Sequence, residues 1–284
     1  MHKDVAVVIG TGGMGRAIAR RIGGGRQFLL ADFNEDALRS GAELLRGDGH
    51  QVTTHVVDVS DAESVRALAQ AAAELGPVRY LAHTAGLSPT QAPTEVILKV
   101  DLLGTALVLD AFAEVVAPGA AAVVIASMAG HSVSGLAPEQ ERLLATAPPG
   151  ELLDLPFLTP ATTNPGAAYA IAKRANLLRV QAAAGPWGAR GARVNAISPG
   201  VISTPMGRQE LDGESGQAMR ALIAMSATGR LGTPDDIAAA AAFLLGPESG
   251  FITGADLLVD GGVVATIATS PNPFGQPETE PGNA

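Results

Sequence analysis

The sequence contains no cysteine among its 284 residues, which excludes disulfide bonds, thiolate metal sites and a cysteine nucleophile. Aromatic residues make up only 4% of the chain, and 28 acidic residues outnumber 19 basic ones, for a net charge of −9. This charge argues against nucleic acid or an anionic membrane as a partner. The apolar run after MHKD is too short for a signal peptide or a membrane span. We therefore expect a soluble, cytoplasmic protein.

What the chain does contain is a regular alternation of short apolar segments with helical patterns rich in Ala and Leu. Strands are predicted at 4–9, 27–31, 52–57, 78–83, 120–126, 192–198 and 256–260, and helices at 13–23, 34–46, 61–75, 93–117, 167–186 and 234–245. Most strands are apolar on both faces, as in a parallel sheet covered on both sides. The pattern predicts a single α/β domain over 1–284, a doubly wound Rossmann fold with seven parallel strands and helices on both faces.

Three segments depart from this alternation. Residues 129–166 separate a strand from the next helix where a short loop would suffice, and residues 203–232 form a second long connection. Such excursions are usually functional, so we expect 129–166 to form a substrate lid and 203–232 to form substrate-binding loops and helices. The C-terminal tail, 265–284, has from Ser270 onwards a composition typical of disorder.

The hexamer GTGGMG follows the first predicted strand and opens a helix, the context in which a glycine pattern indicates a dinucleotide site. Gly10, Gly12 and Gly15 give G-x-G-x-x-G, whereas Gly10, Gly13 and Gly15 give G-x-x-G-x-G. In both patterns one glycine permits the tight turn, one admits the pyrophosphate and one lets the helix pack closely. The hexamer alone does not decide between them, and in both cases Met14 lies at the site.

Asp32 ends the second predicted strand, 22 residues after Gly10. An acid at this place accepts hydrogen bonds from the adenosine ribose and repels a 2′-phosphate. No basic residue lies between Gly10 and Gly15, and Phe33 follows the acid, so the sequence favours NAD over NADP. Asp32 has an alternative role as the cap of the following helix, and both roles can coexist.

Ser127, Tyr169 and Lys173 are the predicted catalytic residues. Tyr169 and Lys173 are four residues apart on a predicted helix and share one face, while Ser127 ends the strand VVIAS. A free tyrosine, with a pKa of about 10, is a poor base at neutral pH, and a nearby ammonium and a cationic nicotinamide favour its phenolate. Tyr169 would then exchange a proton with an alcohol or a carbonyl oxygen, which Ser127 would hold.

Further motifs make the chain resemble the short-chain dehydrogenase/reductase family from residue 4 to about 264. They are VVDVSD, HTAG at 83–86, RVNAISPGVISTPM at 193–206, GRLGTPDDIA and GADLLVDGG. The resemblance implies that Asp58 and Val59 hold adenine, that Thr84, Ala85 and Gly86 border the cofactor, that Pro199, Gly200 and Val201 form the turn over the nicotinamide, and that Thr204 reaches its carboxamide. It also implies that Tyr169 and Lys173 contact the cofactor.

The family's active site is a tetrad of Asn, Ser, Tyr and Lys, and Asp101 stands where the Asn is expected. An ionised Asp101 accepts hydrogen bonds but donates none, and close to Lys173 it would weaken the field that acidifies Tyr169. Asp101 and Thr84 both depart from the family pattern. The alternative that the protein is a catalytically weak or inactive NAD-binding sensor or scaffold therefore stays open. An epimerase or dehydratase of the extended branch is disfavoured, because the chain ends soon after VDGG.

The resemblance extends to the 3α-hydroxysteroid dehydrogenase/carbonyl reductase branch, which has an insertion at the same place and a similar AGLSP segment. It implies an NAD-dependent oxidoreductase that interconverts a secondary alcohol and a ketone on a bulky hydrophobic, steroid- or terpenoid-like substrate. The insertion offers an apolar wall of Leu143, Leu144, Leu152, Leu153, Leu155, Phe157 and Leu158. Alternatively, these residues only pack the insertion onto the body or make a subunit contact.

The resemblance also implies a homo-oligomer, by default a tetramer, built on the helices at 93–117 and 167–186. The insertion precedes the second helix and would leave a dimer if it blocks that interface. None of the five histidines pairs with another at metal-ligand spacing, so no metal is expected. His83 is interpreted as a packed strand residue, and His131, four residues after Ser127, is a weak candidate for touching substrate.

Overall fold

Seven parallel strands form one sheet in the computed structural model, which describes residues 3–159, 164–213 and 215–270. The strands are β1 Val5–Ile9, β2 Gln27–Asp32, β3 Gln51–Val56, β4 Val78–His83, β5 Val116–Ile125, β6 Arg193–Pro199 and β7 Asp256–Val259. Their order is β3-β2-β1-β4-β5-β6-β7, and every pair is parallel. The strand order reverses between β1 and β4, which in this architecture opens a ligand crevice at the carboxyl ends of the strands.

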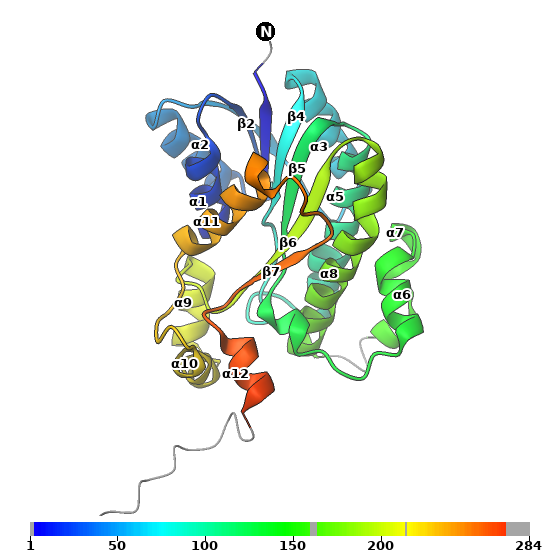
Figure 1. Cartoon of the computed structure of the whole chain (residues 1–284), viewed down its shortest axis with the longest axis vertical. Helices are drawn as coiled ribbons and strands as arrows, with labels where there is room; N and C mark the ends of the chain where they lie inside the picture. Colours follow the sequence, from blue (N-terminus) through cyan, green and yellow to red (C-terminus); the bar gives the residue numbers. More distant parts are fainter. Residues whose placement is uncertain (1–2, 160–163, 214, 271–284) are drawn as a thin grey trace, which may run out of the picture.

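Helices cover both faces of the sheet, as Figure 1 shows. α1 Gly13–Ile22, α2 Glu35–Gly47 and α11 Pro234–Leu245 lie on one face, and α3 Ala62–Leu75, α5 Gly104–Ala113 and α8 Pro165–Ala189 lie on the other. Val7 and Ile9 pack in the core under α3, α5 and α8, whereas Ala6 and Val8 pack in the core under α1, α2 and α11. Successive side chains of a strand point to opposite faces, so β1 is apolar throughout. The predicted doubly wound fold is confirmed.

The single helix predicted at 93–117 is wrong in detail. The segment divides into α4 Thr94–Ile97, a π-helix at Leu98–Leu103 and α5, and the chain is already extended at Val116, where β5 begins. The β-branched Val115 and Val116 disfavour helix, and Gly119 has a φ of 81° that a helix does not accept. Asp101 lies within the π-helix.

The predicted lid and substrate-binding regions are largely helical. The insertion contains the short helix η2 Met128–His131, then α6 Pro138–Thr146, α7 Pro149–Leu152 and η3 Pro156–Leu158. The second region contains α9 Pro205–Asp212 and α10 Gly216–Met225. After η5 Pro247–Ser249 and β7, the chain forms α12 Val263–Thr269, and the rest of the predicted tail, from 271 on, lies outside the described residues. In the described part of the chain, no helix combines the length and the apolarity that crossing a membrane requires.

Candidate active site

The glycine turn joins β1 to α1 at the sheet edge where the strand order reverses. Gly10 has a φ of 92°, and a Cβ built on it would lie 2.6 Å from the backbone nitrogen of Ala85. A Cβ on Gly15 would overlap the Gly10 carbonyl oxygen. Gly12 caps α1 without any side-chain hydrogen bond, so the first N–H groups of the helix are free to bind an anion. The turn therefore fits the pyrophosphate of a dinucleotide.

Asp32 closes the same turn from β2. Its Oδ2 accepts hydrogen bonds from the Thr11 backbone nitrogen at 2.6 Å and from the Thr11 hydroxyl at 2.8 Å, and its Oδ1 accepts one from the Asn34 nitrogen at 2.9 Å. The cap of α2 is Asn34, whose side chain accepts from Asp36 and Ala37, so the alternative role of Asp32 as a helix cap is wrong. Asp32 instead holds Thr11 and presents its carboxylate beside the exposed Phe33.

A cavity of about 700 Å³ runs along the carboxyl ends of β1, β2 and β4. It is lined by most of the predicted cofactor residues, namely Gly10, Gly12, Gly13, Met14, Gly15, Asp32, Phe33, Asp58, Val59, Thr84, Ala85, Gly86 and Thr204. The Thr84 hydroxyl donates to the Gly10 carbonyl at 2.7 Å and to the Ile9 carbonyl at 3.1 Å, which fixes the turn against β4. The volume of this cavity suits a cofactor site, and residues of the glycine turn line it.

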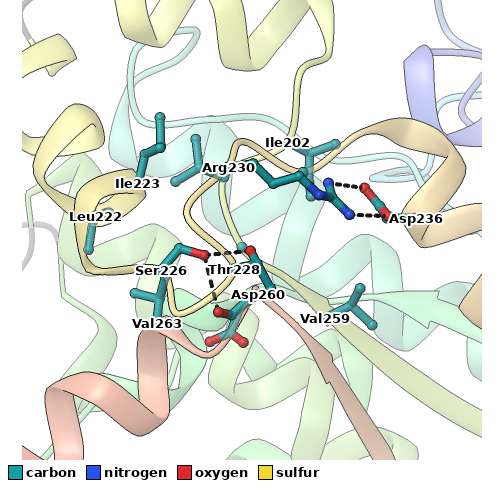
Figure 2. A pocket seen from close by; sticks show the side chains of 14 residues that line it. Ile202, Leu222, Ile223, Ser226, Thr228, Arg230, Asp236, Val259, Asp260 and Val263 are labelled. Atoms are coloured by element: carbon teal, nitrogen blue, oxygen red, sulfur yellow. Dashed lines mark hydrogen bonds and ion pairs between the residues drawn. The ribbon is translucent and has the colours of Figure 1, made fainter.

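The end of β6 and the segment that follows it carry four of the predicted cofactor residues, Pro199, Gly200, Val201 and Thr204. Thr204 caps α9 by accepting a hydrogen bond from the Gly207 nitrogen at 3.0 Å. Gly200 and Val201 line a second, smaller cavity of about 190 Å³, shown in Figure 2, on the other side of the turn that follows β6. Pro199 ends β6. Thr204 and Gly200 thus border two different cavities.

Three elements bring the predicted catalytic residues together. Ser127 lies two residues beyond the end of β5 and caps η2, accepting a hydrogen bond from the Ala129 nitrogen at 3.2 Å. Tyr169 and Lys173 lie on α8, with the Lys173 Nζ 5.4 Å from the centre of the Tyr169 ring. The nearby Ser127 hydroxyl helps to lower the pKa of Tyr169. The hydroxyls of Ser127 and Tyr169 are therefore placed to contact one substrate oxygen.

Gly130 permits this arrangement, and no sequence pattern identifies it as a site residue. A Cβ on Gly130 would lie 2.8 Å from the backbone nitrogen of Arg174 and from the backbone carbon of Lys173. The turn after Ser127 can therefore touch α8 directly, at the level of Lys173. Only the packing of two elements distant in sequence identifies this requirement.

Asp101 forms a buried ion pair with Lys173. The Lys173 Nζ lies 3.5 Å from the Asp101 Oδ2, and the two side chains are 5% and 0% exposed. The Asp101 Oδ1 accepts a hydrogen bond from the Leu87 nitrogen at 2.8 Å, and the Lys173 Nζ donates to the Ile125 carbonyl at 3.4 Å. The π-helix carries Asp101 into this position, in keeping with the frequent occurrence of such bulges at functional sites.

Burial dominates the electrostatics of the three groups. It raises the pKa of Asp101, and the charge of Lys173 offsets this only in part. Burial alone would lower the pKa of Lys173, but the charges of Asp101 and Tyr169 outweigh it and the pKa is raised. Burial also raises the pKa of Tyr169, Lys173 and Ser127 lower it, and Asp101 and Glu210 raise it further. The expected effect of Lys173 on Tyr169 is present, but the net direction is upward.

The insertion is attached to α8 by two arginines. Arg174 donates to the Glu141 Oε1 at 2.9 and 2.6 Å, and the buried Arg179 donates to the Ala147 carbonyl, just after α6, at 2.5 Å. In Figure 1, α6 and α7 lie outside α8 on the side away from the sheet. The insertion therefore forms a layer on the body of the protein.

The leucines of the insertion divide into two groups. Leu144, Leu152, Leu155 and Leu158 are buried in one cluster with residues of α4, the π-helix and α8, so packing onto the body accounts for them. Leu143, Leu153 and Phe157 are partly buried against the same cluster, and so are Tyr169 and Leu87. This apolar cluster therefore reaches Tyr169. Residues 160–163, between the insertion and α8, lie outside the described part of the chain.

The histidines play structural parts. His83 is buried, with its Nε2 3.3 Å from the Thr105 hydroxyl, and burial followed by the charge of Lys173 lowers its pKa to about 3. His131, at the end of η2, has its Nε2 2.8 Å from the Asp256 Oδ2 on β7. His83 is thus the packed strand residue that was predicted, and His131 ties η2 to the sheet.

Comparison with known proteins agrees with this geometry. Residues 4–138 match the family model described as short chain dehydrogenase, and residues 132–264 match the one described as enoyl-(acyl carrier protein) reductase. The short-chain dehydrogenase/reductase bsc3 of Alternaria brassicicola is 39% identical over 269 residues, covering 94% of this chain and 98% of that protein. The chain belongs to the short-chain dehydrogenase/reductase family. It is accordingly an oxidoreductase by family, and the predicted family resemblance is confirmed.

Other members of the family show how widely its substrates vary. The D-threitol dehydrogenase of Mycolicibacterium smegmatis is 34% identical over 271 residues, covering 91% of this chain and 92% of that protein. Actinorhodin polyketide ketoreductase, solved with NADPH, has a TM-score of 0.73 at 24% identity, covering 92% of this chain and 97% of that chain, and shows the same fold. The assignment to the 3α-hydroxysteroid dehydrogenase/carbonyl reductase branch stays a prediction.

Proposed function

We propose that the protein is an NAD-dependent oxidoreductase that interconverts a secondary alcohol and a ketone. The observation that carries the proposal is the convergence of Ser127, Tyr169 and Lys173 at the end of β5, beside a cavity bordered by the glycine turn. A dinucleotide bound there would supply the nicotinamide that accepts or gives the hydride. Side chains of the protein must therefore accept the proton of the alcohol.

In oxidation, the Ser127 hydroxyl donates a hydrogen bond to the substrate oxygen and orients it. The Tyr169 phenolate takes the proton of the alcohol as the hydride leaves the carbon, and the C–O bond becomes a carbonyl. The Lys173 ammonium, with its Nζ 5.4 Å from the Tyr169 ring centre, stabilises the phenolate. Asp101, 3.5 Å from Lys173, holds the ammonium in place but opposes its effect on Tyr169. Reduction runs through the same groups in reverse.

Asp32 supports NAD over NADP. Its carboxylate borders the cavity at the end of β2, next to the free N-terminus of α1, where an adenosine ribose would lie. A 2′-phosphate would meet this negative charge, and Phe33 and Asn34, which follow Asp32 in the lining, offer no cation. We therefore expect NADP to bind at least about tenfold more weakly than NAD.

A bulky hydrophobic substrate, steroid- or terpenoid-like, is supported by the apolar cluster that runs from the insertion to Tyr169. The names of relatives such as D-threitol dehydrogenase offer a contrasting class, a small polyol. The experiment is a screen of hydrophobic alcohols with NAD and ketones with NADH, with small polyols as the comparison set. Tyr169→Phe is the control, and turnover unchanged in that variant would contradict the mechanism.

A cofactor-binding protein without turnover is the second candidate, favoured by the buried pairing of Asp101 with Lys173. Because the carboxylate counteracts the field that acidifies Tyr169, the proton transfer would be slow. Calorimetry that shows NAD binding, together with no turnover of any substrate in the screen, would favour this candidate over the first.

We propose a homodimer rather than the tetramer that the family would suggest. α6 lies against α8, and a cavity of about 160 Å³ lies between α5, α8 and the segment that joins α6 to α7. The insertion thereby covers part of the face formed by α5 and α8. Light scattering that gives a tetramer would overturn this proposal.

A further inference from the structure

The turn that carries Ser127 leaves the sheet just before the insertion. Ala126 is still bonded to β6, with its nitrogen 2.8 Å from the Ile197 carbonyl oxygen, and after Ser127 the chain folds into the four-residue helix η2. The hydrogen bonds inside this turn are local, such as that from the Gly130 nitrogen to the Ser127 carbonyl at 3.0 Å. A single 3₁₀ turn has little stability of its own, so contacts with other elements must fix the position of Ser127.

Two ends of η2 need to be held, because the insertion starts directly after it. His131 ends η2, and residues 133–137, which lead into α6, form no helix or strand. The middle of the turn is held by α8, since a Cβ on Gly130 would lie 2.8 Å from the backbone carbon of Lys173. The end of the turn needs a second contact if movement of the following loop is not to reach Ser127.

His131 makes this second contact with β7. Its Nε2 lies 2.8 Å from the Asp256 Oδ2, and the two side chains are 27% and 14% exposed. Because an ionised carboxylate only accepts hydrogen bonds, the Nε2 of His131 carries a proton and donates it. A hydrogen bond to a charged acceptor is stronger than one between neutral groups. The end of η2 is thereby tied to a strand of the sheet.

Asp256 makes a second bond, to β6, which lies between β5 and β7 (Figure 1). Its Oδ1 accepts a hydrogen bond from the hydroxyl of Ser198, which is fully buried. Ala196 is the partner of Asp256 in the pairing of β6 with β7, so Ser198, two residues further on, has its side chain on the same face. Ser198 directly precedes Pro199 and Gly200, the predicted turn over the nicotinamide. One carboxylate thus bonds to the turn after β5 and to the start of the turn after β6.

We propose that Asp256 is a positioning residue that holds the Ser127 turn and the turn after β6 at a fixed separation. The proposal rests on the proposed function, in which Ser127 holds the substrate oxygen and the second turn covers the nicotinamide. Hydride transfer needs the reacting carbon and the nicotinamide in close contact, and a displacement of about 1 Å costs much of the rate. Asp256 acts only through His131 and Ser198. His131 is then a support for η2 rather than a contact of the substrate.

Hydrogen–deuterium exchange of the cofactor-free protein, followed by NMR, tests the anchoring without any turnover. Asp256→Ala should speed exchange of the Gly130 and Ser132 amides, both bonded within the turn, by about five- to tenfold. Asp256→Asn should stay much closer to the wild type, because its amide oxygen accepts from the imidazole and its amide nitrogen donates to the serine hydroxyl. Leu257→Ala, an exposed change at the next residue of the strand, is the matched control. Exchange in Asp256→Ala equal to that in this control would overturn the proposal.

Binding and single-turnover kinetics separate the two bonds of the carboxylate. His131→Ala should slow hydride transfer by about five- to tenfold and leave the Kd for NADH unchanged. Ser198→Ala should weaken NADH binding by a similar factor, because the turn over the nicotinamide loses its support. Asp256→Ala should show both effects. The same pattern in His131→Ala and Ser198→Ala would overturn the proposal, because it would mean that the two bonds have no separate roles.

A double-mutant cycle decides whether His131 acts through Ser127. In a Ser127→Ala background, His131→Ala should slow hydride transfer no further, because the hydroxyl that it positions is gone. A merely structural role would lower Tm and give additive losses in both backgrounds, and additive losses would overturn the proposal. If the wild type neither binds NADH nor turns over a substrate, the proposed function fails, while the exchange data still decide the anchoring.

Discussion

Asp101→Asn is the most informative substitution in the site, because it tests how the charge of Asp101 affects Tyr169. The amide keeps an oxygen for the Leu87 nitrogen, which donates to Asp101 at 2.8 Å, and removes only the charge. At the 3.5 Å that separates the Asp101 Oδ2 from the Lys173 Nζ, an effective dielectric constant of about 20 gives an attraction of about 5 kcal/mol. Much of this attraction only offsets the cost of burying both charges. Asp101→Asn should therefore alter the electrostatic potential at Tyr169 more than the free energy of unfolding.

The effect on Tyr169 follows from the same arithmetic. Lys173 lies 5.4 Å from the centre of the Tyr169 ring, and at the same dielectric constant of about 20 its charge would favour a phenolate there by about 3 kcal/mol. If Asp101 cancels about half of this, its removal returns about 1.5 kcal/mol, equivalent to about tenfold in the phenolate fraction below the pKa of Tyr169. Since a nearby negative charge raises that pKa, Asp101→Asn should lower it. The oxidation rate at neutral pH should then rise by about tenfold.

The assay is the pH dependence of kcat/KM for alcohol oxidation, which reports the ionisation of the free enzyme. The rising limb should move to lower pH in Asp101→Asn and stay in place in Asp110→Asn, an exposed carboxylate that interacts with Arg179 and is not among the groups that act on Tyr169. A limb that stays in place in Asp101→Asn would refute the reasoning. A shift to higher pH would refute it too, because it would mean that Lys173 loses its own charge without Asp101.

Three further outcomes follow from the structure. Gly15→Ala should abolish NAD binding and cost about 2 kcal/mol or more of stability, because its Cβ overlaps the Gly10 carbonyl oxygen; calorimetry and thermal unfolding check this. Asp32→Asn should narrow the difference between the Kd values for NAD and NADP, and an unchanged ratio would contradict the assigned role of the acid. Arg179→Met should lower Tm by about 3–6 °C, since the Ala147 carbonyl loses its partner, whereas the exposed Arg39→Met should not.

The sequence predicted the sheet, and it predicted that Ser127, Tyr169 and Lys173 come together, because local patterns determine both. β4 was predicted at its observed bounds, since an apolar β-rich run flanked by Gly and Thr has one good assignment. Ser127 follows a parallel strand, and Tyr169 and Lys173 share a helix face, so topology alone brings them near each other. These inferences depend only on where a strand ends and on the spacing of two residues along a helix, and both can be recognised in the sequence.

Other features depend on contacts between distant segments and leave no local pattern. The π-helix at Leu98–Leu103 differs from an α-helix by one shifted hydrogen-bond register, so it was predicted as plain helix. Thr11 gains its role from Asp32, a residue that reaches it only through the folded chain. The burial of Leu144 likewise depends on where α6 comes to rest on α8, which periodicity does not specify.

Deuterium transfer tests the central claim most directly. The protein is incubated with NADH deuterated at the transferable position and with the best ketone of the screen, and the product is analysed by mass spectrometry. The account predicts deuterium on the carbinol carbon with the wild type and a rate reduced by at least about a hundredfold with Tyr169→Phe. Equal transfer by Tyr169→Phe, or no transfer by a wild type that binds NADH, would contradict it.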